Sequence, residues 1–147
     1  EKMLEADGLI MASPVYSHMV PALTKNLFDR FGYIAHRPCF FDKFAMSIAT
    51  CSGYGAEHAL NYTNKGLSVL GFNMVPSLEL QFKPAKVSQA QRDENTRKTI
   101  AAFEVLVDRI RKGVREKPSL NMLIPFGIFK AISIAARDSG NILSNTG

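Results

Sequence analysis

Two short loops hold the residues of this chain whose types and spacing suit chemistry. One has the sequence SPVYSHMV (13–20) and the other TCSGYGAEH (50–58), and each follows an apolar run. If both runs are strands of one parallel sheet, both loops lie beyond the carboxyl ends of the strands, where ligands bind. In the second loop Gly53 and Gly55 let backbone amides approach a ligand, and the helix expected after them favours negative charge.

The side chains of these loops offer few candidates for catalysis. Ser13 precedes a proline and has no nucleophile-elbow spacing. The Gly-x-Gly completes neither a dinucleotide fingerprint nor a Walker A motif, because no Gly-Lys-Ser/Thr follows it. The groups that could pair as acid and base are Ser13, Ser52, His18 and His58. We assign no catalytic side chain, and the amides, hydroxyls and two tyrosines suit a site that holds a planar cofactor and leaves the chemistry to it.

Metal and disulfide chemistry find little support in the sequence. Cys39 and Cys51 match no paired-ligand spacing for zinc, even with the three histidines counted. Two cysteines make a weak disulfide framework for a domain of this size, and reduced thiols are typical of the cytoplasm. The acidic residues near the loops form no recognisable carboxylate pair: Glu5, Asp7, Asp29, Asp42 and Glu57. We expect no metal site and a cytoplasmic location.

The composition fits one domain with a real core, since 46% of the 147 residues are hydrophobic and 21% are charged. The net charge of +5 comes largely from DRIRKGVREK (108–117), which lacks aromatic residues and so favours a solvated helix end over a nucleic-acid surface. The sequence contains no run of about 18 uncharged apolar residues, which is the pattern that predicts a membrane span. The nearest approach, residues 119–136, is interrupted by Pro125, Gly127 and Lys130 and is interpreted as a docked helix or, less favoured, an interfacial one.

Three runs predict strands. Leu9–Ser13 and Phe44–Cys51 are nearly continuous apolar runs, which is typical of strands buried on both faces of a parallel sheet. The third run, 74–82, alternates apolar and polar residues and contains Pro76, which cannot donate a ladder hydrogen bond. We therefore expect the first two strands to lie side by side and the third to form an edge.

Amphipathic helices follow each strand. The first has Pro21 in its first turn, the second ends near Gly71, and the third begins at a capping box, Ser88-Gln89-Ala90-Gln91. The apolar positions that recur with helical spacing are Leu23, Leu27, Phe28 and Phe31 in the first, Ala56, Leu60, Thr63, Leu67 and Leu70 in the second, and Ile100, Phe103, Val107, Ile110 and Val114 in the third.

The alternation of strands and helices predicts an α/β fold. It indicates a parallel sheet with right-handed crossovers and helices on both faces, followed by a C-terminal helix, in a single domain of residues 1–147. The chain opens at EKMLEADG, and its first buried strand would lack a neighbour on one side. We therefore expect the sequence to begin in the middle of a domain.

The segment ADGLIMASPVYSHMVPALTKNLFDR (6–30) resembles the flavodoxin-like NAD(P)H-dependent FMN oxidoreductases, which share its SPVY turn and K-N-x-x-D-R helix. TCSGYGAEHAL (50–60) resembles a glycine-rich flavin loop of that family, and KPSLNMLIPFGIFK (117–130) resembles the C-terminal segment of its iron–sulfur flavoprotein branch. The resemblance implies a flavodoxin-like sheet, FMN as cofactor, NAD(P)H as co-substrate and a small-molecule electron acceptor.

The resemblance also implies which residues contact the flavin. The isoalloxazine ring would be lined by Ser13, Pro14, Val15 and Tyr16. Its pyrimidine side and the ribityl chain would be contacted by Thr50, Cys51, Ser52, Gly53, Tyr54 and Gly55. The family's phosphate-binding strand and loop, and the cysteine cluster of one branch, are not among these residues. We therefore expect the chain alone to bind FMN weakly or not at all and an N-terminally extended version to bind it tightly.

Three functions follow from these observations. The leading one is an FMN-dependent oxidoreductase that takes hydride from NAD(P)H and passes electrons to a quinone, another flavin or a similar acceptor. The alternatives are a flavodoxin-type electron carrier, which the isoelectric point of 9.4 disfavours, and a flavin-free oligomerisation module. A homo-oligomer is also predicted, because the chain offers more apolar surface than a narrow sheet can cover. The residues concerned are Leu120, Leu123, Ile124, Phe126, Ile128 and Phe129.

Overall fold

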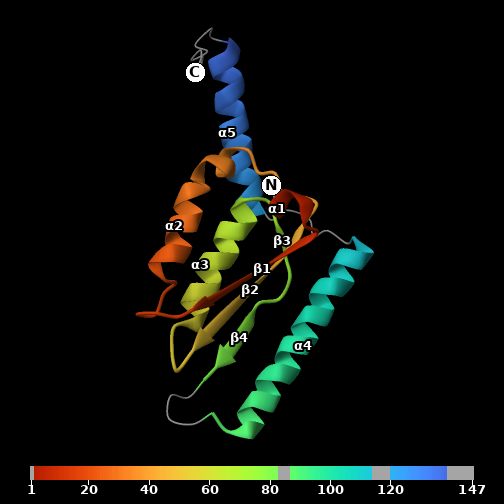
Figure 1. Cartoon of the computed structure of the whole chain (residues 1–147). Coiled ribbons are helices and arrows are strands. Elements are labelled where there is room, and N and C mark those ends of the chain that lie inside the picture. The colour runs from red at the N-terminus through yellow and green to blue at the C-terminus, as the bar shows by residue number, and fades with distance from the viewer. Residues whose placement is uncertain (1, 83–86, 114–119, 139–147) are drawn as a thin grey trace. The chain divides into compact units, whose positions relative to one another are not determined.

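Figure 1 shows a computed structural model, which describes residues 2–82, 87–113 and 120–138. The chain divides into two compact units, Glu1–Arg115 and Glu116–Gly147. The first unit carries the sheet and confirms the predicted alternation of strands and helices. Its elements are α1 (Lys2–Glu5), β1 (Gly8–Pro14), α2 (Ala22–Arg30), a 3₁₀ helix (Gly32–His36), β2 (Phe44–Cys51), α3 (Ala56–Val69), β3 (Asn73–Met74), β4 (Leu78–Gln81) and α4 (Gln89–Lys112).

The sheet is parallel, with β2 in the middle. On one side β2 pairs with the whole of β1, from Gly8 opposite Phe44 to Pro14 opposite Thr50. On its other side β2 pairs with β3 and then with β4, so both strands lie at an edge of the sheet formed by the described residues. This confirms the predicted neighbours and the predicted edge. The third predicted strand is divided in two, and Pro76 lies in the gap.

The two apolar strands differ in burial. Every residue of β2 except Thr50 is buried, as predicted. In β1 only Ser13 is buried and Ile10 is 43% exposed, so the expectation that this strand is buried on both faces was wrong. The reason is position: β1 has β2 on one side, and no described strand pairs with its other side. An apolar pattern shows which residues can be buried, but whether a strand is buried depends on the strands and helices that pack against it.

Helices cover both faces of β2 (Figure 1). The side chains of β2 point alternately to these two faces, so they belong to two separate apolar clusters. Phe44, Met46 and Ile48 pack with residues of α4. Ala45 packs on the opposite face with residues of α3, and Phe28 and Phe31 lie against that cluster. The predicted stripe of α3 is largely confirmed: its buried residues are Ala56, Ala59, Thr63 and Leu67, followed by Leu70.

Two of the predicted helical stripes are only partly buried. In α2, Phe28 packs on the core, but Leu23 is 82% exposed and Leu27 is also exposed. This helix flanks β1, where the described sheet ends, so part of its apolar face has no neighbour.

In α4 the buried stripe shares Ile110 with the predicted one but otherwise differs from it. Ile100, Phe103 and Val107 are exposed, whereas Leu106 is buried and Ala102 and Ile110 pack beside it. The sheet selects the face of α4 that it covers, and α4 has apolar residues on more than one face. Val114 lies outside the described residues.

The helix ends follow the sequence signals. Ser88 caps α4, because its hydroxyl accepts a hydrogen bond from the backbone amide of Gln91 at 3.2 Å. Gly71 follows α3 with a φ of +106°, as expected of a helix-ending glycine. Gly113 ends α4 in the same left-handed region.

The second unit contains α5 (Leu120–Asp138), so the predicted C-terminal helix is confirmed. Its exposed apolar side chains are Ile124, Ile128, Phe129, Ile132 and Ile134. The side chains of Leu120, Leu123 and Phe126, which were part of the predicted oligomer surface, lie outside the described residues. None of the helices in the described ranges is long and apolar enough to cross a membrane.

Candidate functional site

The two loops singled out in the sequence begin side by side. Pro14, the last residue of β1, lies opposite Thr50 near the end of β2. One residue further along, the amide of Val15 donates to the carbonyl of Thr50 at 2.9 Å. Because the strands are parallel, both loops leave the same edge of the sheet, as predicted. The ten residues expected to contact a cofactor, 13–16 and 50–55, are thereby brought together in space.

The first loop turns back on itself immediately. Tyr16 and Met19 exchange two backbone hydrogen bonds, Tyr16 N–H to Met19 O at 2.9 Å and Met19 N–H to Tyr16 O at 3.0 Å. The two residues between them, Ser17 and His18, have φ values of +48° and +65°. This is the backbone of a two-residue hairpin turn with positive φ at both central positions, which normally selects asparagine and glycine. The turn is therefore strained.

The second loop exposes its backbone. Ser52, Gly53 and Tyr54 are exposed, and Gly55 adopts a φ of +93° at the start of α3 without a side-chain cap. Within the described ranges, the amides of Ser52 and Tyr54 donate to no other residue, whereas the backbone of Gly53 is engaged with the Cys51 sulfur. Unbonded amides on a loop at the carboxyl edge of a sheet are the kind of donors that the carbonyl and ring-nitrogen acceptors of a flavin require, so this donor set fits the cofactor.

The candidate residues differ in what their side chains can reach. Tyr16 is 64% exposed and Tyr54 is 86% exposed, so both rings are available to a ligand. Ser13 is buried, and its hydroxyl donates to the carbonyl of Pro14 at 3.0 Å and lies 3.4 Å from the Thr24 hydroxyl. The Ser13 side chain therefore faces the protein. Val15 packs against the buried cluster beneath the loops.

The Cys51 thiol also faces inward. Its sulfur lies 3.7 Å from Oε1 of Glu79 and 3.9 Å from the carbonyl oxygen of Gly53. Burial raises the pKa of Cys51 above its ordinary value, and the Glu79 carboxylate raises that pKa further, against the opposing effect of a backbone hydrogen bond from Gly53. The thiol is therefore protonated at neutral pH and is a poor nucleophile. Through its contacts with Gly53 and Glu79, the Cys51 side chain helps to fix the start of the second loop.

Sequence reasoning missed several residues at this edge. Ser17, His18 and Met19 form the hairpin, and their role depends on backbone angles that residue types did not reveal. Glu79 on β4 was missed too, although the carboxyl end of the third strand pointed to the same edge.

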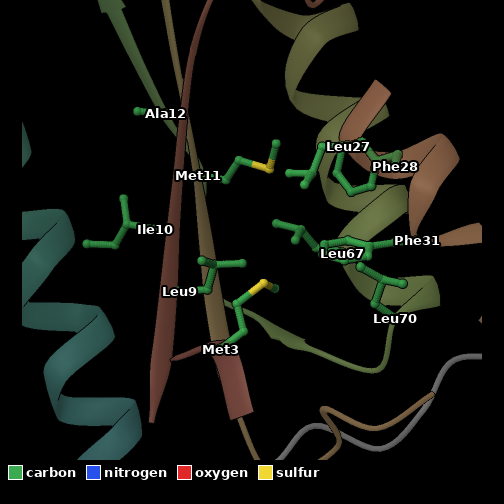
Figure 2. A pocket seen from close by; sticks show the side chains of 10 residues that line it. All are labelled: Met3, Leu9, Ile10, Met11, Ala12, Leu27, Phe28, Phe31, Leu67 and Leu70. Carbon is green, nitrogen blue, oxygen red and sulfur yellow. The ribbon is translucent and has the colours of Figure 1, made fainter. Parts of the chain in front are cut away.

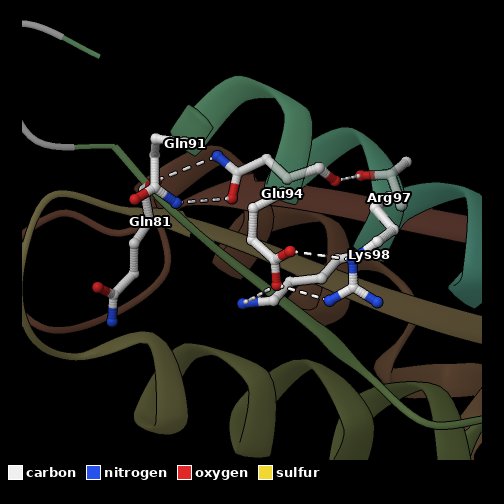
Figure 3. A network of polar contacts seen from close by, with 7 residues as sticks. Gln81, Gln91, Glu94, Arg97 and Lys98 are labelled. Carbon is white, nitrogen blue, oxygen red and sulfur yellow. Dashed lines mark hydrogen bonds and ion pairs between the residues drawn. The ribbon is translucent and has the colours of Figure 1, made fainter. Parts of the chain in front are cut away.

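A polar cavity of about 460 Å³ lies between β4 and α4. Its lining residues are Glu79, Gln81, Gln91, Glu94, Asn95 and Lys98. Figure 3 shows that most of these groups bind one another. The amide of the buried Asn95 donates to the carbonyl of Gln81 at 3.2 Å and accepts from Gln91 at 3.3 Å.

Charges beside this cavity are also paired. Arg97 binds both oxygens of Glu94, at 2.9 and 2.8 Å, and lowers the pKa of that carboxyl. Lys98 lies 3.6 Å from the same carboxylate. The groups of the cavity therefore tie α4 to β4, and we read them as structural.

A second cavity, of about 230 Å³, lies beside β1 and is apolar (Figure 2). Leu9 and Met11 point into it toward Phe28 and Phe31, while Ile10 points to the opposite side of the strand. It contains no acid, base or charged side chain, so it can pack apolar groups but offers no chemistry. No group of three histidine, cysteine, aspartate or glutamate residues among those described could hold a metal ion.

Comparison with known proteins agrees with the geometry of the two loops. The family model for NADPH-dependent FMN reductase matches residues 1–86, and the chain belongs to this family. An iron-sulfur flavoprotein from Archaeoglobus fulgidus is 38% identical over 68 residues, which are 46% of this chain. The match spans only 31% of the length of that relative.

Solved structures support the fold. Rubredoxin oxygen:oxidoreductase from Desulfovibrio gigas superposes with a TM-score of 0.52 at 12% identity, covering 74% of this chain and 24% of that protein. A flavodoxin, a WrbA-like protein from Agrobacterium tumefaciens, has a TM-score of 0.44 at 15% identity and covers 69% of both chains. The parallel sheet and the superposition at a TM-score of 0.52 agree with an open α/β fold of the flavodoxin-like class, as the resemblance implied.

Proposed function

We propose that this chain is the part of an FMN-dependent oxidoreductase that holds the flavin ring. The protein would take hydride from NAD(P)H and pass electrons to a quinone, another flavin or a similar small acceptor. The observation that carries this proposal is the pair of adjoining loops at the carboxyl edge of the sheet, with free amides at Ser52 and Tyr54 and exposed tyrosine rings on both loops. Membership of the family supports the same cofactor.

Each part of the site would have a distinct task. The amides of Ser52 and Tyr54 would donate to the acceptors along the pyrimidine edge of the flavin. Tyr16 and Tyr54 would pack on the ring system and exclude water from it. Pro14 lacks an N–H and fixes its own φ, while the buried Ser13 and Cys51 side chains would hold the loops from beneath. When bound, FMN would supply the redox chemistry, so the protein needs no acid–base residue of its own.

Titration of the 147-residue chain with FMN, followed by flavin fluorescence, tests this site. Replacing Tyr54 by Ala removes ring packing worth about 0.5–1.5 kcal/mol, so we expect FMN binding to weaken up to about tenfold. Tyr33→Ala is the matched control, because Tyr33 is also exposed, at 73%, but lies in the 3₁₀ helix outside the loops. Equal weakening by both variants, or none by Tyr54→Ala, would contradict the proposed ring site.

Anaerobic oxidation of NADPH in the presence of FMN tests the reaction. FMN-dependent oxidation supports the oxidoreductase. Binding of FMN without NADPH oxidation would favour the electron-carrier alternative. Failure of an N-terminally extended version of the chain to bind flavin would overturn the cofactor assignment for these residues and favour the flavin-free alternative.

Three further features belong to the same proposal. We infer a homo-oligomer, supported by the exposed apolar side chains of α5, among them Ile124, Ile128 and Phe129. We infer a cytoplasmic location, supported by two free thiols, Cys39 and Cys51. We also infer that residues 1–147 belong to one flavodoxin-like domain, an inference that the family match supports for residues 1–86.

A further inference from the structure

The two loops touch each other backbone to backbone at Gly55. A Cβ atom added to Gly55 would lie 2.5 Å from the Cα of His18 and 3.1 Å from its carbonyl carbon. It would also lie 3.0 Å from Cγ1 of Val15. The atoms of His18 are main-chain atoms in the tight hairpin, so they cannot move aside as the end of a flexible side chain would. Only glycine permits this approach.

Gly55 differs from the other described glycines. It alone combines a positive φ with a main-chain atom of another segment less than 3.0 Å from an added Cβ. Gly113 also has a positive φ but faces open space, and Gly66 is crowded by the ring of Phe28 only. Gly53, two residues earlier in the same loop, has no neighbour within 4 Å of an added Cβ. The restriction at Gly55 is therefore local and specific to its contact with the hairpin.

The hairpin has a reason to need this contact. Ser17 and His18 occupy positive φ values without being glycine or asparagine, and such backbones persist only where the surrounding structure holds them. The two hydrogen bonds between Tyr16 and Met19 close the turn from within. The packing of His18 on Gly55 supports it from outside.

We propose that Gly55 is a positioning residue that couples the Tyr16–Met19 hairpin to the Thr50–Gly55 loop. Its missing side chain lets the two loops form one rigid body, which fixes Tyr16 relative to Tyr54 and the free amides of Ser52 and Tyr54. The consequence for a flavin rests on the function proposed above, whereas the coupling itself does not. Gly55 therefore serves the site through His18, and a direct contact between Gly55 and the cofactor is not required.

Hydrogen exchange in the absence of flavin tests the coupling. In Gly55→Ala and Gly55→Asn we expect the amides of Tyr16 and Met19 to exchange at least tenfold faster than in the native chain. Asn tolerates positive φ, so Gly55→Asn removes the close approach while largely keeping the backbone angle. Unchanged exchange in both variants would overturn the coupling. Loss of protection in Gly55→Ala but not in Gly55→Asn would also overturn the coupling, because the faster exchange would then come from the positive φ of residue 55 and not from the close approach to His18.

Two glycines outside the loops provide controls. Gly32→Ala faces open space and should leave exchange at Tyr16 and Met19 unchanged. In Gly66→Ala the added methyl group would meet the Phe28 ring, so this variant should have a lower melting temperature without selective opening of the hairpin. Selective opening of the hairpin by Gly66→Ala would show that general destabilisation explains the effect.

Flavin binding tests the positioning role. We expect the dissociation constant for FMN to rise at least tenfold in both Gly55 variants and to change less than twofold in Gly32→Ala. If neither the native chain nor an N-terminally extended version binds FMN, the proposed function fails while the exchange experiment still decides the coupling. Unchanged FMN affinity in variants with an opened hairpin would overturn the positioning role.

A third variant covers the case in which Gly55→Ala does not fold. Replacing Ser17-His18 by Asn-Gly gives the turn its preferred residues, so the hairpin should close without help from Gly55. Adding Gly55→Ala to this background should leave Tyr16 and Met19 protected but keep FMN binding at least tenfold weaker than in the Asn-Gly background. Native-like FMN binding by the triple variant would overturn the proposal.

Discussion

At the scale of single residues, the loops divide into side chains that face outward and side chains that hold the loops in place. Tyr16 and Tyr54 face outward, whereas the hydroxyl of Ser13 and the thiol of Cys51 are turned into the protein. A residue can therefore belong to a binding loop without presenting its side chain to the ligand. Substitutions at the two kinds of position should have different effects: loss of binding at the first and loss of stability at the second.

The stability of the folded chain should fall at alkaline pH because of the buried Cys51 thiol. Burial raises the pKa of this thiol in the folded chain above its ordinary value of 9.0, so the unfolded chain loses its proton first as the pH rises. The protonated Cys51 thiol makes its full contribution to the free energy of unfolding below about pH 9. Above that pH the contribution is lost, with a limiting slope of about 1.4 kcal/mol per pH unit. Urea unfolding of Cys39→Ser and Cys39→Ser/Cys51→Val between pH 7 and 10.5 measures this. Identical pH slopes for the two proteins would contradict it.

The strained hairpin should be improved by substitution. Replacing Ser17-His18 by Asn-Gly fits residues that accept positive φ, and we expect the free energy of unfolding to rise by about 1 kcal/mol. Thermal unfolding of the native and substituted chains checks this. Ser68→Asn, at a position inside α3 with negative φ, provides a control in which asparagine should give no such gain. A lower stability of the Asn-Gly variant would mean that Ser17 or His18 makes a contact worth more than the strain.

At the scale of elements, packing partners decide which apolar residues are buried. Strand β2 has a strand on each side and helices on both faces, and it is almost completely buried. Strand β1 has a similar apolar sequence but a free flank in the described sheet, and Ile10 remains partly exposed. Helix α4 shows the same effect, because its several apolar residues compete for one contact with the sheet.

Paired substitutions on α4 should separate its two apolar stripes. Leu106 is 5% exposed and packs on β2, so Leu106→Ala should lower the free energy of unfolding by about 2–5 kcal/mol. Phe103→Ala removes a larger side chain from an exposed position and should cost less than about 1 kcal/mol. Chemical denaturation of the two variants measures the difference. A larger loss of stability in Phe103→Ala than in Leu106→Ala would support the buried stripe that the sequence predicted.

The contact of α4 with β4 should depend on Asn95. Its amide is buried and donates to the carbonyl of Gln81, so Asn95→Ala should cost about 1–3 kcal/mol of stability. Asn61→Ala on α3 is the matched control, because Asn61 is exposed in its helix and the same substitution should be neutral or slightly stabilising there. Equal effects of the two substitutions in urea unfolding would argue against a tie at Asn95.

At the scale of the whole molecule, the second unit adds a helix whose described apolar side chains are exposed. An apolar surface of this kind marks an interface. We expect the chain to sediment as an oligomer at micromolar concentration. Ile128→Glu should shift it toward the monomer, because a charge would be buried in the interface. Ser133→Glu, at another exposed position of α5, should have a smaller effect. A native chain that sediments as a monomer would contradict the proposal.

The sequence by itself determined the elements, their order and the edge at which a ligand would bind. Those signals are local: the apolar run of β2, Pro76 in the third strand, the cap at Ser88 and the glycine at position 71 each act over a few residues. The SPVY turn and its helix also carried the resemblance to a flavin-binding family, and the family match bears out that resemblance.

Tertiary structure alone decided the burial of β1, the face of α4 that packs, the inward turn of Ser13 and Cys51, and the contact between His18 and Gly55. Each of these depends on which segment lies opposite, at a distance of many residues along the chain. Residue types limit what a position can do, but van der Waals contact and burial are properties of pairs of surfaces. The distance between two loops therefore becomes defined only when the sheet brings their strands together.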